Sequence, residues 1–134
     1  MSYSYEENYD YCTRLTRNGV LRSDGVIFTE DTFIESHRTK VPIVWNNDYS
    51  LHCILGMASL VVKDDGVYAY CIFNDSEYGV IAKKLLLEDE DVEMSFYANK
   101  VKKDPRNNKK IVSAKIHSVN MIPEGTGFKY EDET

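Results

Sequence analysis

One serine and two histidines of this sequence could form a nucleophile and its base: Ser95, His52 and His117. A serine hydroxyl becomes a useful nucleophile only when a base lies within hydrogen-bonding reach, and imidazole is the usual base. The three residues fall on different expected strands, so their separation in sequence is not diagnostic, because nucleophile and base need only be close in space. Ser95 is also typical of a solvent-facing strand serine, and His117 of a strand histidine with an ordinary hydrogen bond. Both interpretations stay open.

The spacing of the histidines, cysteines and glycines does not match a metal site or a cofactor site. His37, His52 and His117 are scattered, and none has a partner at i+2, i+3 or i+4 that completes a zinc pattern. The three cysteines form no CxxC pair and are odd in number, which disfavours a zinc site or a disulfide framework and favours a reducing compartment. The sequence has no glycine-rich phosphate loop. We therefore expect no metal and no cofactor.

The charged segments indicate which partners to expect. Net charge is −6, which disfavours nucleic acid as the main partner. An eleven-residue stretch is strongly basic and could contact phosphates, but it carries no RNA-binding signature and no interleaved aromatic residues, which favours a solvated hairpin tip. Its basic residues are Lys100, Lys102, Lys103, Arg106, Lys109 and Lys110. The acidic run Glu88–Glu93 is its counterpart, and a solvated loop is the favoured interpretation there too.

The first residues show no basic n-region and no apolar h-region, so we expect no signal peptide. The longest apolar run is far shorter than the ~20 residues that a membrane-spanning helix needs, and we expect no membrane partner.

The elements that must position these residues are mostly strands. Alternating and apolar runs predict short strands within 19–28 around a turn near Ser23–Gly25, then strands at Val41–Trp45 and from about His52 to Lys63. Asp-Asp-Gly at 64–66 predicts a hairpin. Thr29 predicts the start of a short helix, and Asp75 or Ser76 the start of a helix through Leu87. Two further strands, around 92–101 and 111–122, complete the order β-β-α-β-β-β-α-β-β.

This order predicts an α+β, mostly β fold: a small antiparallel β-barrel or curled sheet with two short helices. The length predicts one domain, which we place at 17–124, between an N-terminal arm (1–16) and a flexible tail (125–134). The arm carries odd-numbered tyrosines that share one side of an extended chain: Tyr3, Tyr5, Tyr9 and Tyr11. It is either a loose arm or first strand on its own domain, or an arm that docks on a neighbouring subunit and makes a homo-oligomer.

The order of the motifs adds a resemblance. The chain presents in turn NGVLRSDGVIFTEDTFIES, VPIVWNND, HCILGMASLVV, KDDGVYAYCIF, SEYGVIAKKLLLED, DVEMSFYA and IHSVNMIP. In this order the stretch from about Arg17 to Glu124, about four-fifths of the chain, resembles the prohead proteases of tailed bacteriophages. These are serine proteases of head assembly that are related in fold to the herpesvirus assembly proteases.

The resemblance assigns roles residue by residue. Ser95 matches the nucleophile of the family's Leu-Ser strand, and Asn47 stands where the family's Asn-His-Asp motif has its catalytic histidine. An amide accepts no proton at neutral pH, and loss of a general base typically removes ~10²–10⁴-fold in rate. His117 lies at or beside the third catalytic position, and either His52 or His117 could act as a substitute base.

We therefore expect a phage head-assembly protein with a prohead-protease-like fold that binds capsid or scaffold subunits without cleaving them. Its location would be the host cytoplasm and the prohead or virion. One alternative is an active serine protease of capsid maturation that uses Ser95 with His52 or His117. Another is an unrelated small β-domain, such as a capsid decoration protein.

Overall fold

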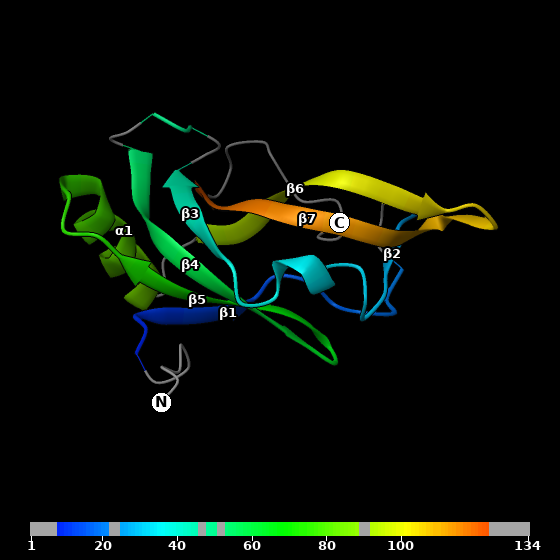
Figure 1. The fold of residues 1–134 in the computed structure, drawn as a ribbon. Coiled ribbons are helices and arrows are strands. Elements are labelled where there is room, and N and C mark those ends of the chain that lie inside the picture. The colour runs from blue at the N-terminus through cyan, green and yellow to red at the C-terminus, as the bar shows by residue number, and fades with distance from the viewer. Residues whose placement is uncertain (1–7, 22–24, 46–47, 51–52, 89–91, 124–134) are drawn as a thin grey trace.

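The computed structural model describes residues 8–21, 25–45, 48–50, 53–88 and 92–123, and these form a mostly β fold (Figure 1). The described part contains seven strands, one α-helix and a short 3-10 helix. Their bounds are β1 (Tyr11–Arg14), β2 (Ile27–Phe28), the 3-10 helix (Ile34–Ser36), β3 (Lys40–Trp45), β4 (Ile54–Lys63), β5 (Gly66–Phe73), α1 (Glu77–Leu87), β6 (Val92–Asp104) and β7 (Asn107–Pro123).

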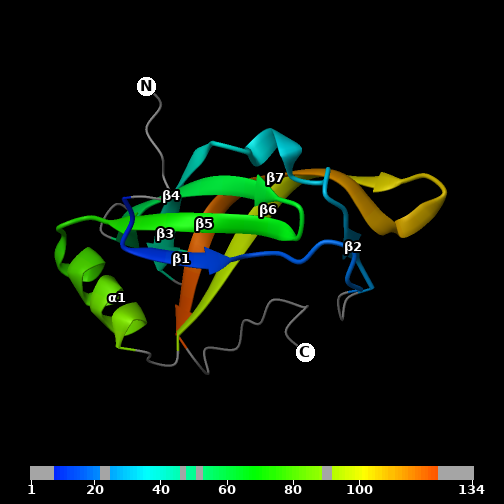
Figure 2. The same ribbon diagram turned by 90° about the horizontal axis from the view of Figure 1, so that it is seen from below.

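All seven strands belong to one curled, half-barrel sheet. Its order is β1-β5-β4-β3-β7-β2, and β6 pairs with β7 outside this path. Seen from below, β6 and β7 pass behind β4 and β5 at a steep angle (Figure 2). The curl lets the two halves bury one hydrophobic core between them, which includes Ile43, Leu60, Ile116 and Val119.

The prediction of a mostly β, curled sheet is confirmed, but the sheet is mixed rather than antiparallel. β2 and β3 both run parallel to β7, with Val44 beside Asn120 and Phe28 beside Ile111. Local hairpin signals report only strands that are adjacent in sequence. Between β3 and β7 the chain forms β4, β5, α1 and β6. A connection of this length allows β7 to lie parallel to β3.

Local signals correctly predicted the β4–β5 hairpin and α1. The β4–β5 register ends at Lys63 opposite Gly66, so Asp64 and Asp65 form the turn. α1 begins after Ser76, whose hydroxyl accepts a hydrogen bond from the Gly79 amide at 3.1 Å. Such a cap satisfies one of the unpaired amides of the first turn.

The helix expected after Thr29 is wrong: this segment forms only turns and the 3-10 helix. Its polar groups bond to β7 instead of to a helix of their own. Thr32 Oγ1 donates to Ile111 O at 2.6 Å, the Ala114 amide donates to Thr32 O at 2.9 Å, and the Ile116 amide donates to Ser36 Oγ at 3.0 Å. The segment thereby covers the edge of β7 between its pairings with β2 and β3.

The part of the N-terminal arm within the described residues packs on its own sheet. Tyr11–Arg14 form β1, which pairs with β5. Tyr9 lies edge-on to Tyr70 at a centroid distance of 5.1 Å, and Arg14 forms an ion pair of 2.8 Å with Asp65. The Tyr68 hydroxyl and the Arg14 guanidinium both hydrogen-bond to Asp65 and lower the pKa of that carboxyl. Residues 8–14 therefore behave as a first strand, while Tyr3 and Tyr5 lie outside the described residues.

Candidate functional site around Ser95

The centre of the β6–β7 hairpin brings together a row of polar side chains that includes Ser95. Ser95 pairs with Asn120, and Tyr97 pairs with Ser118. Paired residues of antiparallel strands share a face, and alternate residues along a strand do too. These four residues therefore form one polar row, defined here as the Ser95 row. Phe96 and Val119 pair on the opposite face and belong to the hydrophobic core.

Ser95 is more buried than either interpretation of the sequence required. Its exposed fraction is 5%, and its Oγ atom has no hydrogen-bond partner among the described residues. Ser118 is also buried, but its Oγ lies 2.7 Å from the Tyr49 hydroxyl. Burying a hydroxyl without a partner costs about 1–3 kcal/mol, so the hydroxyl of Ser95 destabilises the fold.

His117 occupies a β-bulge one step further along β7. Ser118 pairs with Tyr97 and Ile116 with Ala98, so His117 is the extra residue between two pairs. A bulge redirects a side chain out of the regular alternation. The exposed imidazole lies edge-on to the rings of Tyr97 and Tyr49, at centroid distances of 5.8 and 5.9 Å.

The structure does not join His117 to Ser95 in a catalytic dyad. Asn120, not His117, stands opposite Ser95, and His117 lies three positions before Asn120 on β7, or about 10 Å along a strand. Since Ser95 Oγ has no described hydrogen-bond partner, His117 does not act on it in this conformation.

The other two predicted site residues, Asn47 and His52, lie outside the described residues. The end of β3 can still be placed. Trp45 pairs with Met121 on one side of β7, and Met94 pairs with the same residue on the other. β3 and β6 are therefore two strand spacings apart, about 10 Å, at the level of Ser95. The strand that leads to Asn47 thus reaches the same level of the sheet as Ser95.

Burial keeps two of the cysteines from acting as nucleophiles in place of the serine. Burial raises the pKa of the Cys71 thiol to about 12, with Cys12 and Asp10 as smaller causes. Burial also raises the pKa of the Cys53 thiol, and the nearby Asp48 adds to the effect. The thiolate is the reactive form, so the raised pKa values favour the unreactive neutral thiol at both positions.

Sequence analysis identified Ser95 and His117 but missed Tyr49, Tyr97, Ser118 and Asn120. The last three could have been found from the alternation of their strands, which puts Tyr97 on the face of Ser95 and Ser118 on that of Asn120. Tyr49 carries no such signal, because it lies in the irregular segment between β3 and β4.

Replacing Ser95 by alanine is expected to raise the free energy of unfolding by about 1 kcal/mol, because it removes a buried hydroxyl that has no partner. Ser118→Ala is the matched control on the same row. It should lower the free energy of unfolding by about 1 kcal/mol, because Tyr49 loses its hydrogen-bond partner. Urea denaturation measures both. A clear loss of stability in Ser95→Ala would show that the hydroxyl has a partner that matters.

Within residues 8–21, 25–45, 48–50, 53–88 and 92–123, no three histidine, cysteine, aspartate or glutamate side chains gather closely enough to hold a metal ion. In the same part of the chain no helix has the length and apolar character to cross a membrane. Comparison of the whole chain with protein-family models, curated proteins and solved structures finds no match.

Proposed function

We propose that this chain is a head-assembly protein of a tailed bacteriophage, with a fold like that of the prohead and herpesvirus assembly proteases. It binds capsid or scaffold subunits and does not cleave them. The observation that carries the proposal is the state of Ser95 on β6, whose Oγ is buried and has no described hydrogen-bond partner. A serine in this state has no base among the described residues to take its proton, and an unassisted hydroxyl is a poor nucleophile at neutral pH.

The order of the elements supports the prohead-protease-like part of the proposal. The segments that resemble successive family motifs form β2, β3, β4, β5, α1, β6 and β7 in turn. The nucleophile position on β6 lies beside the closing strand β7. The end of β3, two residues before Asn47, lies across β7 from it.

The binding part of the proposal rests on the outer edge of β6. β6 pairs with β7, and no other described strand pairs with it. The backbone groups of a strand that lies at the edge of a sheet can bind an extended peptide by strand addition. A segment of a capsid or scaffold subunit added there would run directly beside Ser95. A protease fold without its base thus keeps a site for peptide.

A second candidate, an active serine protease, is favoured by the bulge at His117. The bulge turns the imidazole onto the rings of Tyr97 and Tyr49, at the side of the Ser95 row. His52 is the other base that this candidate could use.

A fluorophosphonate probe separates the two candidates. We expect no labelling of Ser95 in the native protein and no self-cleavage on storage, because no base activates the hydroxyl. Asn47→His should introduce weak labelling, since this substitution puts an imidazole at the base position of the family. Robust labelling of the wild type that His117→Ala or His52→Ala abolishes would establish the active protease and identify its base.

Co-expression with the capsid and scaffold proteins of the same phage genome tests the assembly part separately. We expect this chain to co-elute intact with one of them on size exclusion. Elution as a separate species, together with an unlabelled Ser95, would leave the chain non-proteolytic but would overturn its assignment to head assembly.

A further inference from the structure

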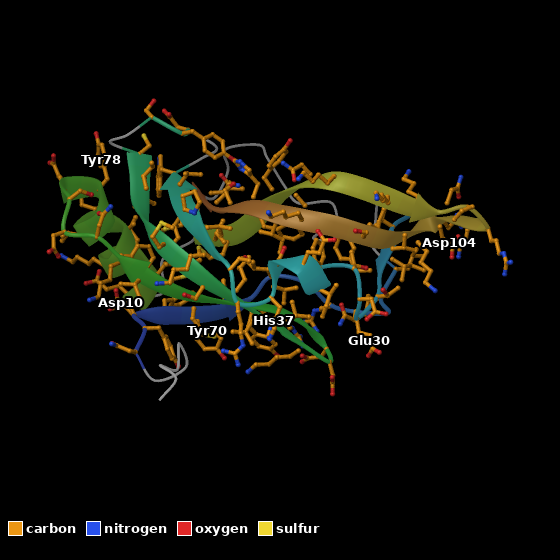
Figure 3. The ribbon with its side chains drawn as sticks, in the orientation of Figure 1. Asp10, Glu30, His37, Tyr70, Tyr78 and Asp104 are labelled. Carbon is orange, nitrogen blue, oxygen red and sulfur yellow. The ribbon has the colours of Figure 1, made fainter. Side chains whose placement is uncertain are left out.

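The molecule carries two complementary surfaces at its opposite ends. α1 lies at one end and the tip of the β6–β7 hairpin at the other, in both ribbon views (Figures 1 and 2). The labels of Tyr78 on α1 and Asp104 at the hairpin mark the two ends among the side chains (Figure 3). Neither surface belongs to the Ser95 row.

The first surface is an apolar hollow between α1 and the ends of β3 and β4. Its volume is about 300 Å³. One wall is the stripe Tyr78, Ile81 and Leu85, which lie on one side of the helix, and the other wall is Trp45, Cys53 and Leu55. Ile81 is 46% exposed, so the hollow opens to solvent. An open apolar hollow of this size fits one or two aliphatic side chains of a partner.

Helical spacing, and the contact of Asp48 with Cys53, place carboxylates at the rim of this hollow. Asp48 lies beside Cys53 and interacts with its thiol. Glu77 precedes Ile81 by one helical turn, and Glu88 follows Leu85 by three residues. α1 has two lysines. Lys83 forms an ion pair of 3.2 Å with Asp10, so Lys84 is the one basic residue of the helix on the side of the hollow. The acidic excess favours an apolar anchor flanked by basic residues.

The second surface has that chemistry. The β6–β7 hairpin carries Lys100, Lys102, Lys103, Arg106, Lys109 and Lys110, and none of them forms an ion pair with a described residue. Val101 stands among them and is 52% exposed. A β-bulge presents it: Asn99 pairs with Lys115 and Lys102 with Ser113, so Lys100 and Val101 together face one residue of β7. Bulges and lysines also protect a strand edge from aggregation, but that role needs no exposed valine.

We infer that the hairpin tip of one copy docks on the acid-rimmed hollow of a second copy, with Val101 entering the hollow and the lysines facing its carboxylates. The two surfaces differ and lie at opposite ends, so the contact is head-to-tail. A head-to-tail contact continues from copy to copy and yields a ring or an open chain rather than a closed dimer. Because the contact depends on charge, it weakens as salt rises.

Sedimentation velocity of the full chain over a range of concentrations tests this inference. At an ionic strength of about 0.01 M, where the Debye length is about 30 Å, we expect species heavier than a monomer. At about 1 M, where it is about 3 Å, we expect the monomer. A monomer at every concentration and salt would overturn the inference.

Charge reversal identifies the surfaces. We expect neither Lys102→Glu/Lys103→Glu nor Glu77→Lys/Glu88→Lys to self-associate, whereas an equimolar mixture of the two should regain heavier species, because acidic hairpins then meet basic rims. Arg17→Glu/Lys40→Glu changes the net charge by the same amount and sign as Lys102→Glu/Lys103→Glu, at exposed positions elsewhere, and should associate like the wild type. Failure of the mixture to regain association would overturn the inference.

Two apolar variants test the anchor. Val101→Ser and Ile81→Ser should each abolish association, whereas Val80→Ser, at an exposed position on another side of α1, should not. Association that is unaffected by these variants but lost on deletion of residues 1–7 would assign the contact to the N-terminal arm. Heavier species that nuclease treatment removes would instead show nucleic acid on the basic hairpin. Either result would overturn the inference.

Discussion

Phe33→Ala is expected to lower the free energy of unfolding by about 3–5 kcal/mol, the range for removing a fully buried phenylalanine. Phe33 is 1% exposed, although it lies in a segment with little regular structure. Its ring lies edge-on to Phe28 at a centroid distance of 4.9 Å and to Phe96 at 5.7 Å. These three rings join β2, the segment before β3, and β6, so the cavity left by alanine would open where three parts of the fold meet. Urea denaturation measures the loss.

Ile34→Ala is the matched control for this prediction. Ile34 is the next residue and is equally apolar, but it is 56% exposed. Its truncation should change the free energy of unfolding by no more than about 0.5 kcal/mol. Equal effects of the two substitutions would mean that the 3-10 segment does not pack on β7 as described here.

The elements that sequence analysis predicted correctly are those whose signals are local. The Asp64-Asp65-Gly66 turn and the Ser76 cap each depend on no more than four neighbouring residues, so each can be recognised from the local sequence whatever the segment packs against. The alternation along β6 is local too: Met94 and Phe96 lie on one face of the strand and Ser95 on the other.

The incorrect structural predictions concern segments whose hydrogen-bond partners lie far away in the sequence. Thr32 and Ser36 bond to groups on β7 that are 79 and 80 residues away, and these bonds replace those of the expected helix. The parallel pairing of β3 with β7 likewise depends on a crossover that hydrophobic periodicity does not record.

Two members of the candidate site were predicted from the sequence, but its other members and its geometry were not. The sequence pointed to Ser95 and His117, yet it could not show that Ser95 is buried or that a bulge carries His117 out of register. Register decides which residue stands opposite Ser95, and register is set by the whole hairpin. The apolar hollow was also missed, because it joins α1 to strands more than twenty residues earlier in the chain.

Gly79→Ala is expected to lower the free energy of unfolding by about 3 kcal/mol, although alanine is the better helix former by about 1 kcal/mol. Gly79 is buried in the first turn of α1. A Cβ atom there would lie against Asn74 Oδ1, 2.6 Å from Asn74 O and 3.0 Å from Leu55 O. The two carbonyl oxygens belong to the backbone and cannot rotate away. Asn74 is also held in place, since its side chain donates to Ile54 O at 2.8 Å and accepts from the Ser76 amide at 3.2 Å.

The sign of the change in the free energy of unfolding distinguishes steric crowding around the new Cβ atom from the gain in helix propensity. If the close approach of α1 to Asn74 and Leu55 is real, Gly79→Ala must push the helix away from β4, and the apolar hollow lined by Leu55 and Ile81 must change with it. Val80→Ala, at the next and exposed position, should instead stabilise the protein by a few tenths of a kcal/mol, because propensity alone acts there. Both are measured by urea denaturation. A gain of stability in Gly79→Ala would show that the start of α1 lies farther from the sheet than described, and the hollow between them would then be wider too.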